Sequence, residues 1–267
     1  MDPADVCRYW EGNAENWTRL SRAGYDVYRD VLNTPAFLAM LPPVSGLAGL
    51  DIGCGEGTNT RHLARLGARM QAIDFAPTFI HHAQAEEERE PLGITYQVAD
   101  GISLPFVDGS FDFAAAFMSL MDMPDQARAL AEAARVLRPG GFLQFSILHP
   151  CFAPPHRRVV RDPAGRTLAI EVGRYFQTDA YIDEWIFSEI PAEQRSGIEP
   201  FRIPVFHHPL SQWVDFIGSA GLVIEKFGEP CASPEVAAAV PQVADTRVAP
   251  LFLHVRARKP HAAPATE

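Results

Sequence analysis

The order of hydrophobic and polar residues predicts an alternation of strands and helices through the middle of the chain. Short apolar runs end in acidic residues or glycine, and most are followed by a longer amphipathic segment. Expected strands cover 47–53, 68–74, 94–100, 111–120 and 142–148, and expected helices cover 58–67, 77–90 and 125–141. Strands that alternate with helices form parallel βαβ units with right-handed crossovers. The pattern therefore predicts a doubly wound parallel sheet.

The segments before and after this alternation predict a helical cover and an inserted cap. Residues 5–41 carry aromatic and leucine side chains at helical spacing, and the prolines at 42 and 43 end that segment. After His149 the rhythm stops, and residues 151–205 are rich in proline, arginine and aromatic side chains. We interpret this stretch as an insertion that covers the core, because it shows no second core pattern.

The last part of the chain returns to the α/β pattern. It predicts a helix over 209–221 and strands over 222–228 and 250–258. We therefore expect one α/β domain made of a helical cover (1–42), a first part of the core (43–150), a cap (151–205), a completion of the core (206–259) and a tail (260–267).

Composition and charge limit the classes of protein to which the chain can belong. The 267 residues carry a formal net charge of −10, which disfavours a nucleic-acid partner because phosphate binding requires a basic face. The four cysteines are far apart and form no C-x-x-C pair, so neither a zinc site nor a redox motif is indicated. No apolar run approaches the roughly 20 residues that cross a bilayer, and the N-terminus lacks an apolar signal core. We expect a cytoplasmic, reduced protein with no membrane span.

The segment LDIGCGEGTNT, residues 50–60, joins the first predicted strand to the first predicted helix through Gly53, Gly55 and Gly57. Closely spaced glycines let a ligand approach the backbone, and the following helix N-terminus supplies N–H groups without intrahelical partners. Ligands of open α/β sheets bind at the carboxyl ends of the strands, where this loop lies. A dinucleotide fingerprint would have its third glycine at position 58, which is threonine, so the spacing weakens a dinucleotide interpretation.

Acidic residues around the loop define the ligand further. Asp51 and Glu56 flank it, and both would repel a diphosphate and attract a cation. Asp74 ends the second predicted strand, where its carboxylate can accept hydrogen bonds from a ribose diol. Asp100 ends the third, where it can accept one from an adenine amino group. These acids imply a ligand with a cationic end, a ribose and an adenine. The plainer alternatives are that Asp74 caps a helix and Asp100 caps a turn.

Four segments in this order and spacing resemble class I S-adenosylmethionine-dependent methyltransferases: LDIGCGEGTNT, AIDFAP, VADGISLPFVDGSFD and EAARVLRPGGFLQFS. The similarity covers residues 47–148 and is to the small-molecule branch that includes the ubiquinone and menaquinone type. It implies S-adenosylmethionine as cofactor and a Rossmann-like sheet of seven strands with the last antiparallel. It also implies a small substrate, aromatic or quinone-like, that is methylated at O or N, as in secondary metabolism.

The resemblance also implies which residues contact the cofactor. They are Asp51, Gly53, Gly55 and Gly57 at the methionine end, Asp74 at the ribose, Phe75, Asp100, Gly101 and Ile102 at the adenine, and Phe117 and Met118 under the sulfonium. An N-terminal helix often closes over the cofactor in this fold, so Tyr25 is a further candidate, with core packing as its alternative. Many relatives have a histidine near residues 121–123, which here read Met-Asp-Met. We assign no catalytic role to that position.

Histidines near the sheet edge are the candidate bases. His149 ends the fifth predicted strand, and His207 and His208 precede a helix near the same edge. We predict catalytic roles for His149 and His208, with structural roles as the alternative, and we expect no metal site. The aromatic residues of the cap suit a lid over a flat substrate, or a satellite hydrophobic cluster.

Two rival functions remain at this stage. One is a nicotinamide-dependent oxidoreductase on a related Rossmann sheet, against which the glycine spacing and Asp51 argue. The other is a protein that binds S-adenosylmethionine without catalysing methyl transfer. The sequence predicts neither the oligomeric state nor the identity of the substrate.

Overall fold

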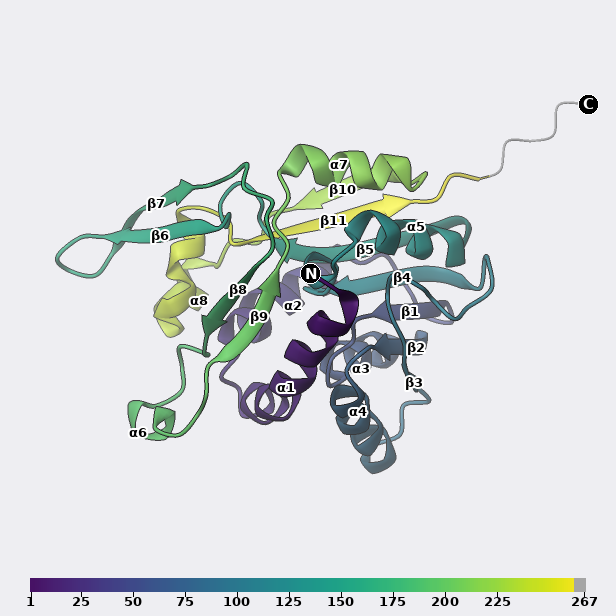
Figure 1. The fold of residues 1–267 in the computed structure, drawn as a ribbon, viewed down its shortest axis with the longest axis horizontal. Helices are drawn as coiled ribbons and strands as arrows, with labels where there is room; N and C mark the ends of the chain where they lie inside the picture. The colour runs from purple at the N-terminus through teal and green to yellow at the C-terminus, as the bar shows by residue number, and fades with distance from the viewer. Residues whose placement is uncertain (262–267) are drawn as a thin grey trace, which may run out of the picture.

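The computed structural model describes residues 1–261, and its centre is a sheet of seven strands (Figure 1). The strands are β1 (Ala48–Ile52), β2 (Arg69–Asp74), β3 (Thr95–Val98), β4 (Phe111–Phe117), β5 (Leu137–Leu148), β10 (Val223–Gly228) and β11 (Phe252–Arg258). Their order across the sheet is β10-β11-β5-β4-β1-β2-β3. Strands β1 to β5 run parallel, whereas β11 is antiparallel to both of its neighbours. The predicted Rossmann-like sheet with an antiparallel last strand is therefore confirmed. Most of the predicted tail, 262–267, lies outside the described residues.

Helices cover both faces of this sheet. On one face lie α2 (Thr34–Met40), α3 (Thr58–Arg65) and α4 (Pro77–Arg89), and on the other lie α5 (Gln126–Val136) and α7 (Leu210–Ser219). Helix α5 is shorter than the predicted 125–141. It ends at Val136 because the next residue, Leu137, already pairs with Phe111 in the sheet.

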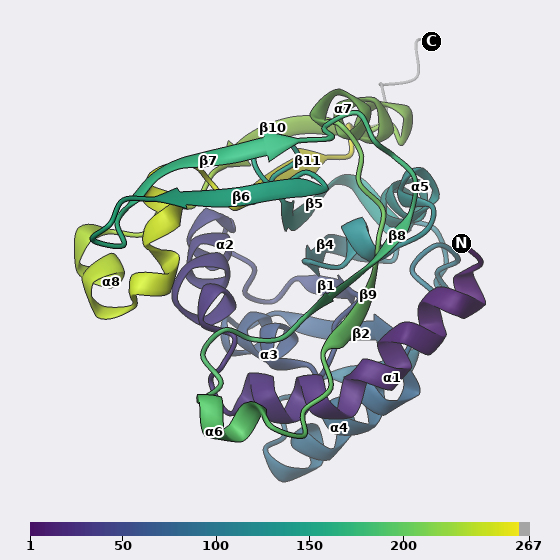
Figure 2. The same ribbon diagram turned by 60° about the vertical axis from the view of Figure 1, so that its left-hand side comes forward.

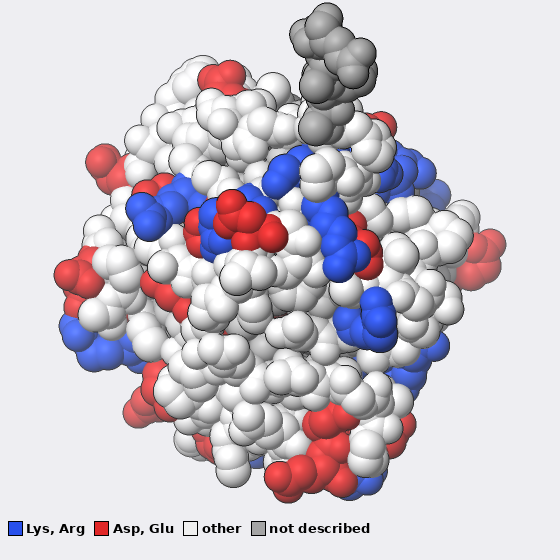
Figure 3. Space-filling view, turned by 90° about the vertical axis from the view of Figure 1, so that its right-hand side faces the viewer, with Lys and Arg blue, Asp and Glu red and all other residues white. Residues whose placement is uncertain are grey.

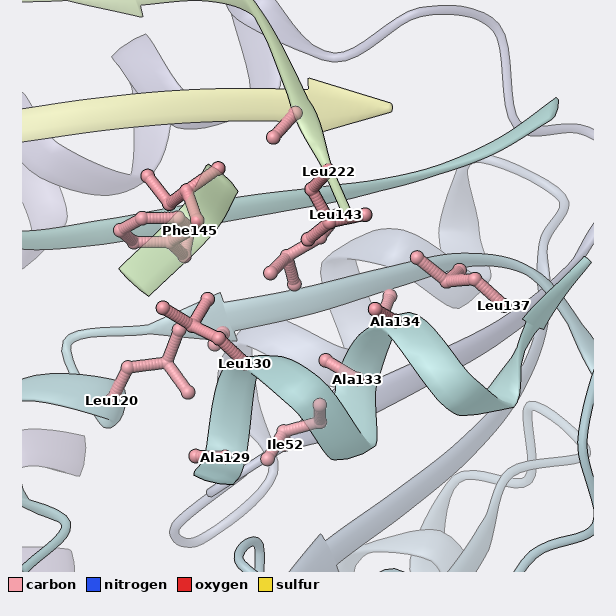
Figure 4. Close-up of a cluster of buried hydrophobic side chains, with 14 of the residues drawn as sticks. Ile52, Leu120, Ala129, Leu130, Ala133, Ala134, Leu137, Leu143, Phe145 and Leu222 are labelled. Carbon is pink, nitrogen blue, oxygen red and sulfur yellow. The ribbon is translucent and has the colours of Figure 1, made fainter. Parts of the chain in front are cut away.

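Strand β4 packs apolar side chains against the helices on both faces of the sheet. Phe113 and Ala115 pack toward α3 and α4, while Ala114 and Ala116 pack toward α5. All four side chains are fully buried, as expected of a central parallel strand covered on both faces. Figure 4 shows the α5 layer, in which Leu130 and neighbouring alanines of the helix lie near side chains of β5. Each fully buried leucine or phenylalanine in such a layer stabilises the fold by about 2 kcal/mol.

The N-terminal cover is helical, as the pattern over 5–41 predicts, but it is bent rather than straight. Helix α1 (Pro3–Arg22) stops at Gly24, whose φ of +83° takes the chain out of the helical conformation. A π-helical turn over Arg29–Asn33 then leads into α2, and Leu41 ends the cover just before the prolines. Figure 2 shows α1 lying beside α4 at the edge of the molecule.

The cap consists of two β-hairpins, which the sequence pattern did not predict. One pairs β6 (His156–Arg161) with β7 (Thr167–Gly173), and the other pairs β8 (Tyr181–Trp185) with β9 (Phe201–Val205). The second hairpin is joined through a short helix, α6 (Ala192–Arg195), and it crosses the molecule toward α1 (Figure 2). Helix α8 (Pro234–Ala239) and a 3₁₀ turn over Pro241–Arg247 connect β10 to β11.

An aromatic cluster joins the cover to the cap. The Trp17 ring of α1 lies with its centroid 5.5 Å from that of Trp185, 5.1 Å from Phe187 and 4.8 Å from Phe201. These edge-to-face and tilted contacts form a small hydrophobic core separate from the sheet. The satellite cluster, one of the two alternatives for the aromatic residues of the cap, is therefore present, and it holds α1 against the β8–β9 hairpin.

Charges of both signs are mixed on the end of the molecule where β11 stops and β5 begins (Figure 3). Arg135 pairs with Asp108 at 2.8 Å, and Arg138 pairs with Asp112. No helix in the described part of the chain has the length and apolar character needed to span a membrane.

Candidate active site

A cavity of about 790 Å³ lies at the carboxyl ends of β1, β2 and β4. Its floor includes the loops that follow these strands, and its roof includes α1 and the β8–β9 hairpin. The floor is rich in carboxylates, whereas the roof is mainly aromatic and aliphatic. Ligand sites in proteins commonly enclose about 300 to 1,000 Å³, so this one is large enough for a nucleoside and a second small molecule. Predicted residues that line it are Tyr25, Asp51, Gly53, Gly55, Asp74, Phe75, Asp100, Gly101, Phe117, Met118 and His208.

Three predicted residues do not line the cavity. Gly57 packs against Tyr96 behind the loop, and Ile102 packs against the hydrophobic core. His149 lies beneath the surface next to Glu229. The first two still belong to the loops that shape the floor.

The three loop glycines have different physical roles, although all adopt positive φ values of 55° to 88°. A Cβ atom at Gly53 would lie 2.4 Å from Ser119 Cβ, and one at Gly57 would lie 2.7 Å from Tyr96 Oη. These two positions need glycine because other side chains approach the backbone. A Cβ atom at Gly55 would meet nothing within 4 Å. Gly55 is therefore the position where the open space above the loop is left for a ligand.

The start of α3 has no capping side chain. Gly57 occupies the cap position without a side-chain hydrogen bond. Thr58 instead donates its hydroxyl to Glu56 at 2.9 Å, and Asn59 accepts one from Thr34 at 2.9 Å. The N–H groups at this helix start are thus not occupied by a capping side chain.

Asp51 is a fully buried carboxyl with one oxygen unsatisfied. Its Oδ2 accepts a hydrogen bond from the Thr60 hydroxyl at 2.6 Å, while Oδ1 has no partner among residues 1–261. Burial raises the pKa of Asp51 to about 7, and the charge of Asp74 adds to the rise. A buried, unsatisfied acceptor at the cavity floor fits the ammonium group of a ligand, which would restore the ionised form.

Asp74 connects the end of β2 to the glycine loop. Its Oδ2 accepts from the Gly55 N–H at 2.9 Å, and its Oδ1 accepts from the Ala76 N–H at 2.9 Å. Burial raises the pKa of Asp74 to about 6, and the backbone hydrogen bonds only partly offset this rise. Because each carboxylate oxygen has a second lone pair, this geometry leaves acceptor capacity for a diol. Asp100 accepts from the Ile102 N–H at 3.0 Å, so the turn-capping alternative is realised there alongside a place on the cavity wall.

Met118, directly after β4, has a strained backbone at the cavity floor. Its φ of 54° is uncommon for a residue with a side chain. The Met118 N–H donates to the carbonyl of Ser146 at 3.0 Å and lies 3.2 Å from its hydroxyl. The hydroxyl of Ser146 in turn contacts Asn33, whose amide oxygen accepts from His254 at 2.6 Å. This buried polar chain fixes the end of β4 at the floor of the cavity.

His149 is only 3% exposed, and both of its ring nitrogens are engaged. Nε2 lies 2.9 Å from Glu229 Oε1, and Nδ1 accepts from the Cys151 N–H at 3.2 Å. The imidazole therefore links the start of the cap to the residue that follows β10. This placement supports the structural alternative over the predicted catalytic role.

His208 lines the cavity, but its nitrogens are engaged as well. Nδ1 lies 3.0 Å from Gln212 Oε1, and Nε2 lies 3.0 Å from Gln126 Oε1. The Gln126 amide donates to the carbonyl of Phe206 at 3.3 Å, which turns its oxygen toward the histidine. Nε2 therefore carries the hydrogen. Burial lowers the pKa of His208, which favours the neutral ring, and its Nδ1 faces the Gln212 side chain.

Sequence reasoning missed several polar groups of the cavity. Arg157, from the cap, pairs with the buried Asp245 at 2.7 Å, and the other oxygen of Asp245 accepts from the Tyr28 hydroxyl at 3.0 Å. Asp122 also lines the cavity, and burial raises its pKa well above the ordinary value. The sequence signals only an arginine-rich stretch here, because Asp245 lies 88 positions from Arg157 and 217 from Tyr28.

Glu56 is held by the N-terminal cover. Its carboxylate accepts from Arg22 Nε at 3.0 Å and lies 3.4 Å from Arg29 Nη1. The side chain is 5% exposed, so the two guanidinium groups compensate a buried charge. Tyr25 is also held, since its hydroxyl donates to Gln194 of the cap at 2.9 Å.

Comparisons with known proteins agree with this geometry. The family model described as a methyltransferase domain matches residues 50–145. An O-methyltransferase from Penicillium expansum is 41% identical over 117 residues, which is 42% of either chain. A demethylmenaquinone methyltransferase from Thermobifida fusca is 32% identical over 143 residues, 53% of this chain and 60% of that protein. The chain thus spans about half the length of these curated relatives.

A solved structure matches over a larger share of the chain. The crystal structure of an S-adenosylmethionine-dependent methyltransferase from Mesorhizobium loti has a TM-score of 0.67 and 30% sequence identity. The match covers 84% of this chain and 96% of that one. The similarity therefore includes the cover and cap regions in part, in addition to the segment of the family model.

Proposed function

Because the chain belongs to the S-adenosylmethionine-dependent methyltransferases, we propose that it transfers the methyl group of S-adenosylmethionine to O or N of a small aromatic or quinone-like molecule. The observation that carries the proposal is the two-part cavity. Its floor offers buried carboxyl groups and an open glycine loop, and its roof offers aromatic and aliphatic side chains. A cationic nucleoside suits the first part, and a flat apolar acceptor suits the second.

The residues of the floor fit the cofactor of this family. Asp51 would face the ammonium group, Asp74 the ribose and Asp100 the adenine, with Gly55 leaving the space between them. When bound, S-adenosylmethionine supplies an activated methyl group on a sulfonium with a neutral leaving group. The protein then needs chiefly to orient the acceptor atom about 3 Å from the methyl carbon and to exclude water. We expect the end of β4 at Met118 to serve the first task and the roof to serve the second.

The surroundings of the site support a small acceptor in a reducing compartment. The four cysteines are all free thiols, which is consistent with the proposed cytoplasmic setting. Arg135 and Arg138 each pair with a carboxylate, which favours a small molecule over a nucleic acid.

The oxidoreductase alternative is not favoured. A dinucleotide would place its diphosphate at the glycine loop, beside the buried carboxyl groups of Asp51 and Asp74. The cavity floor does not distinguish the enzyme from a protein that binds S-adenosylmethionine without catalysing methyl transfer. Only an assay of methyl transfer distinguishes it from the enzyme.

Titration calorimetry with S-adenosylhomocysteine and with NADH tests the floor. We expect the nucleoside to bind the wild type and NADH not to bind. Asp74→Ala removes two charge-assisted hydrogen bonds of about 1.5 kcal/mol each, so the affinity should fall about 100-fold. Asp215→Ala, an exposed acid on α7, is the matched control and should bind like the wild type.

Thermal unfolding of each variant shows whether the fold is retained. Equal nucleoside affinity for Asp74→Ala and the wild type would overturn the ribose assignment. Tight binding of NADH would instead support the oxidoreductase. Mass spectrometry of phenols and hydroquinones incubated with S-adenosylmethionine detects a gained methyl group. Binding of the nucleoside with no methylated product from any phenol or amine would favour the non-catalytic alternative.

A further inference from the structure

Among the histidines at the cavity, one has a ring nitrogen that is not engaged. We propose that His207 is the general base that accepts the proton of the acceptor during methyl transfer. The proposal rests on the proposed function, and it replaces both histidines that the sequence pattern indicated. His207 lines the cavity just after β9 and is 8% exposed.

The ring of His207 is fixed by a backbone carbonyl. Its Nε2 lies 2.8 Å from the carbonyl oxygen of Tyr175. A carbonyl can only accept, so Nε2 carries the hydrogen, and Nδ1 is the nitrogen with the lone pair. Nδ1 has no hydrogen-bond partner within residues 1–261, and it is not among the polar atoms that are sealed from solvent without a partner. The orientation resembles that of a base held by an acceptor on its second nitrogen.

The carbonyl that holds His207 is itself held in place. The Tyr175 hydroxyl accepts a hydrogen bond from the Leu210 N–H at 2.9 Å, three residues beyond the histidine. The preceding residue, Arg174, has a φ of 59°, and its carbonyl accepts from the Gln177 N–H at 2.9 Å. A strained turn and a side-chain anchor thus aim one carbonyl at one imidazole. The strained turn lies behind the cavity lining, and His207, which it positions, lines the cavity.

The surroundings of His207 keep the ring neutral. Burial lowers its pKa, the neighbouring His208 adds to the lowering, and the hydrogen bond to Tyr175 partly offsets it. The lone pair is therefore available at neutral pH. His149 and His208 lack this property, because partners already engage both nitrogens of each ring.

The proton balance of the step is simple. The acceptor O–H or N–H passes its proton to Nδ1 of His207, and the acceptor atom forms a bond to the methyl carbon. The bond between that carbon and the sulfonium sulfur breaks with its electron pair, which leaves a neutral thioether. The imidazolium that forms is stabilised by the Tyr175 carbonyl and returns its proton to solvent. No oxidant, reductant or metal is required.

A series of phenols that differ in acidity tests this role. For the phenols that the wild type methylates, kcat/KM is compared with that of His207→Gln at pH 7.5. A phenol with a pKa of about 7 is already largely ionised there, so its rate should fall by no more than about threefold. A phenol with a pKa of about 10 needs the base, so its rate should fall about 100-fold. His156→Gln, an exposed histidine of the β6–β7 hairpin, is the matched control and should behave like the wild type for every phenol.

Two further measurements separate a base from a structural residue. S-adenosylhomocysteine should bind His207→Gln as it binds the wild type, and added imidazole should restore part of the rate of His207→Ala with weakly acidic phenols. A loss of equal size for all phenols, with no rescue, would overturn the proposal. So would a loss that depends on phenol acidity in Asp122→Asn but not in His207→Gln. If the wild type methylates no phenol or amine, the proposed function fails, and the base with it.

Discussion

The two halves of the cavity are built in different ways. Asp51, Asp74 and Asp100 of the floor come from successive strand ends, and each is placed by the strand that precedes it. The roof brings together Trp17 from the cover and Trp185 and Phe201 from the cap, which are more than 160 positions apart. The floor therefore follows from local pattern plus sheet topology. The roof depends on contacts between segments that no local pattern connects, so it can vary among relatives while the floor stays constant.

The largest expected effect comes from a substitution that loosens the roof of the cavity and leaves the floor unchanged. Phe201→Ala truncates a side chain that is 1% exposed in the aromatic cluster, which should lower the stability of the cover–cap contact by about 3 kcal/mol. Limited proteolysis should then cut the β8–β9 hairpin much faster than in the wild type. Phe176→Ala, on an aromatic residue that is 83% exposed, is the control. Equal cleavage of all three proteins would show that the cluster does not hold the cap.

The next effect distinguishes two glycines within the floor. Gly57→Ala introduces a Cβ 2.7 Å from Tyr96 Oη at a φ of +88°, so the free energy of unfolding should fall by about 2 kcal/mol. Gly55→Ala has only the backbone strain, about 1 kcal/mol, but it fills the space above the loop. Urea unfolding measures the loss of stability in both variants. Calorimetry should show that Gly55→Ala weakens the binding of S-adenosylhomocysteine by more than its loss of stability explains. The reverse ranking in urea would contradict the assigned roles.

The smallest expected effect is on the number of protons released when the ligand binds. Burial raises the pKa of Asp51 to about 7 and of Asp74 to about 6, from 3.8. Between about pH 4 and pH 7 the folded state therefore binds protons that the unfolded chain has lost, so these groups lower stability as the pH rises through that window. A cationic ligand reverses both shifts, and its binding near pH 6.5 should release up to about one proton.

Calorimetry in two buffers of different ionisation enthalpy measures that release. Asp51→Asn should reduce it, because the group with the higher pKa is gone. A count that does not change between the wild type and this variant would show that Asp51 stays ionised without the ligand.

The sequence was sufficient for the sheet because each strand and helix is marked by its own residues. The apolar run of β4, the proline at the start of α4 and the glycine loop are local signals, and all three lie where they were expected. The length of α5 was wrong because Leu137 is drawn into the sheet by Phe111, a partner 26 positions earlier. The bend at Gly24 was missed because helical spacing continues on both sides of it.

The site could be predicted only in part for the same reason. A carboxylate at the end of a strand must lie at the sheet edge, so the three acids were found by position. Whether a histidine nitrogen is free to accept a proton depends on the hydrogen-bond partners of its ring. Those of His149 and His208 are Glu229 and Gln126, about 80 positions away, and that of His207 is a backbone carbonyl, which leaves no mark in the sequence.

Glu56 in the glycine loop pairs with Arg22 and Arg29 of the N-terminal cover, so these two segments should change together in evolution. If this glutamate became neutral, Arg22 and Arg29 would each lose a counter-charge, although Arg29 would keep Asp26 and Asp30 nearby. If the first helix were deleted or exchanged, a carboxylate in the glycine loop would lose its partner Arg22. Charge at position 56 and charge at position 22 should consequently be inherited as a pair, and grafting the amino-terminal segment of a relative onto this core should succeed only when the matching loop residue is transferred with it.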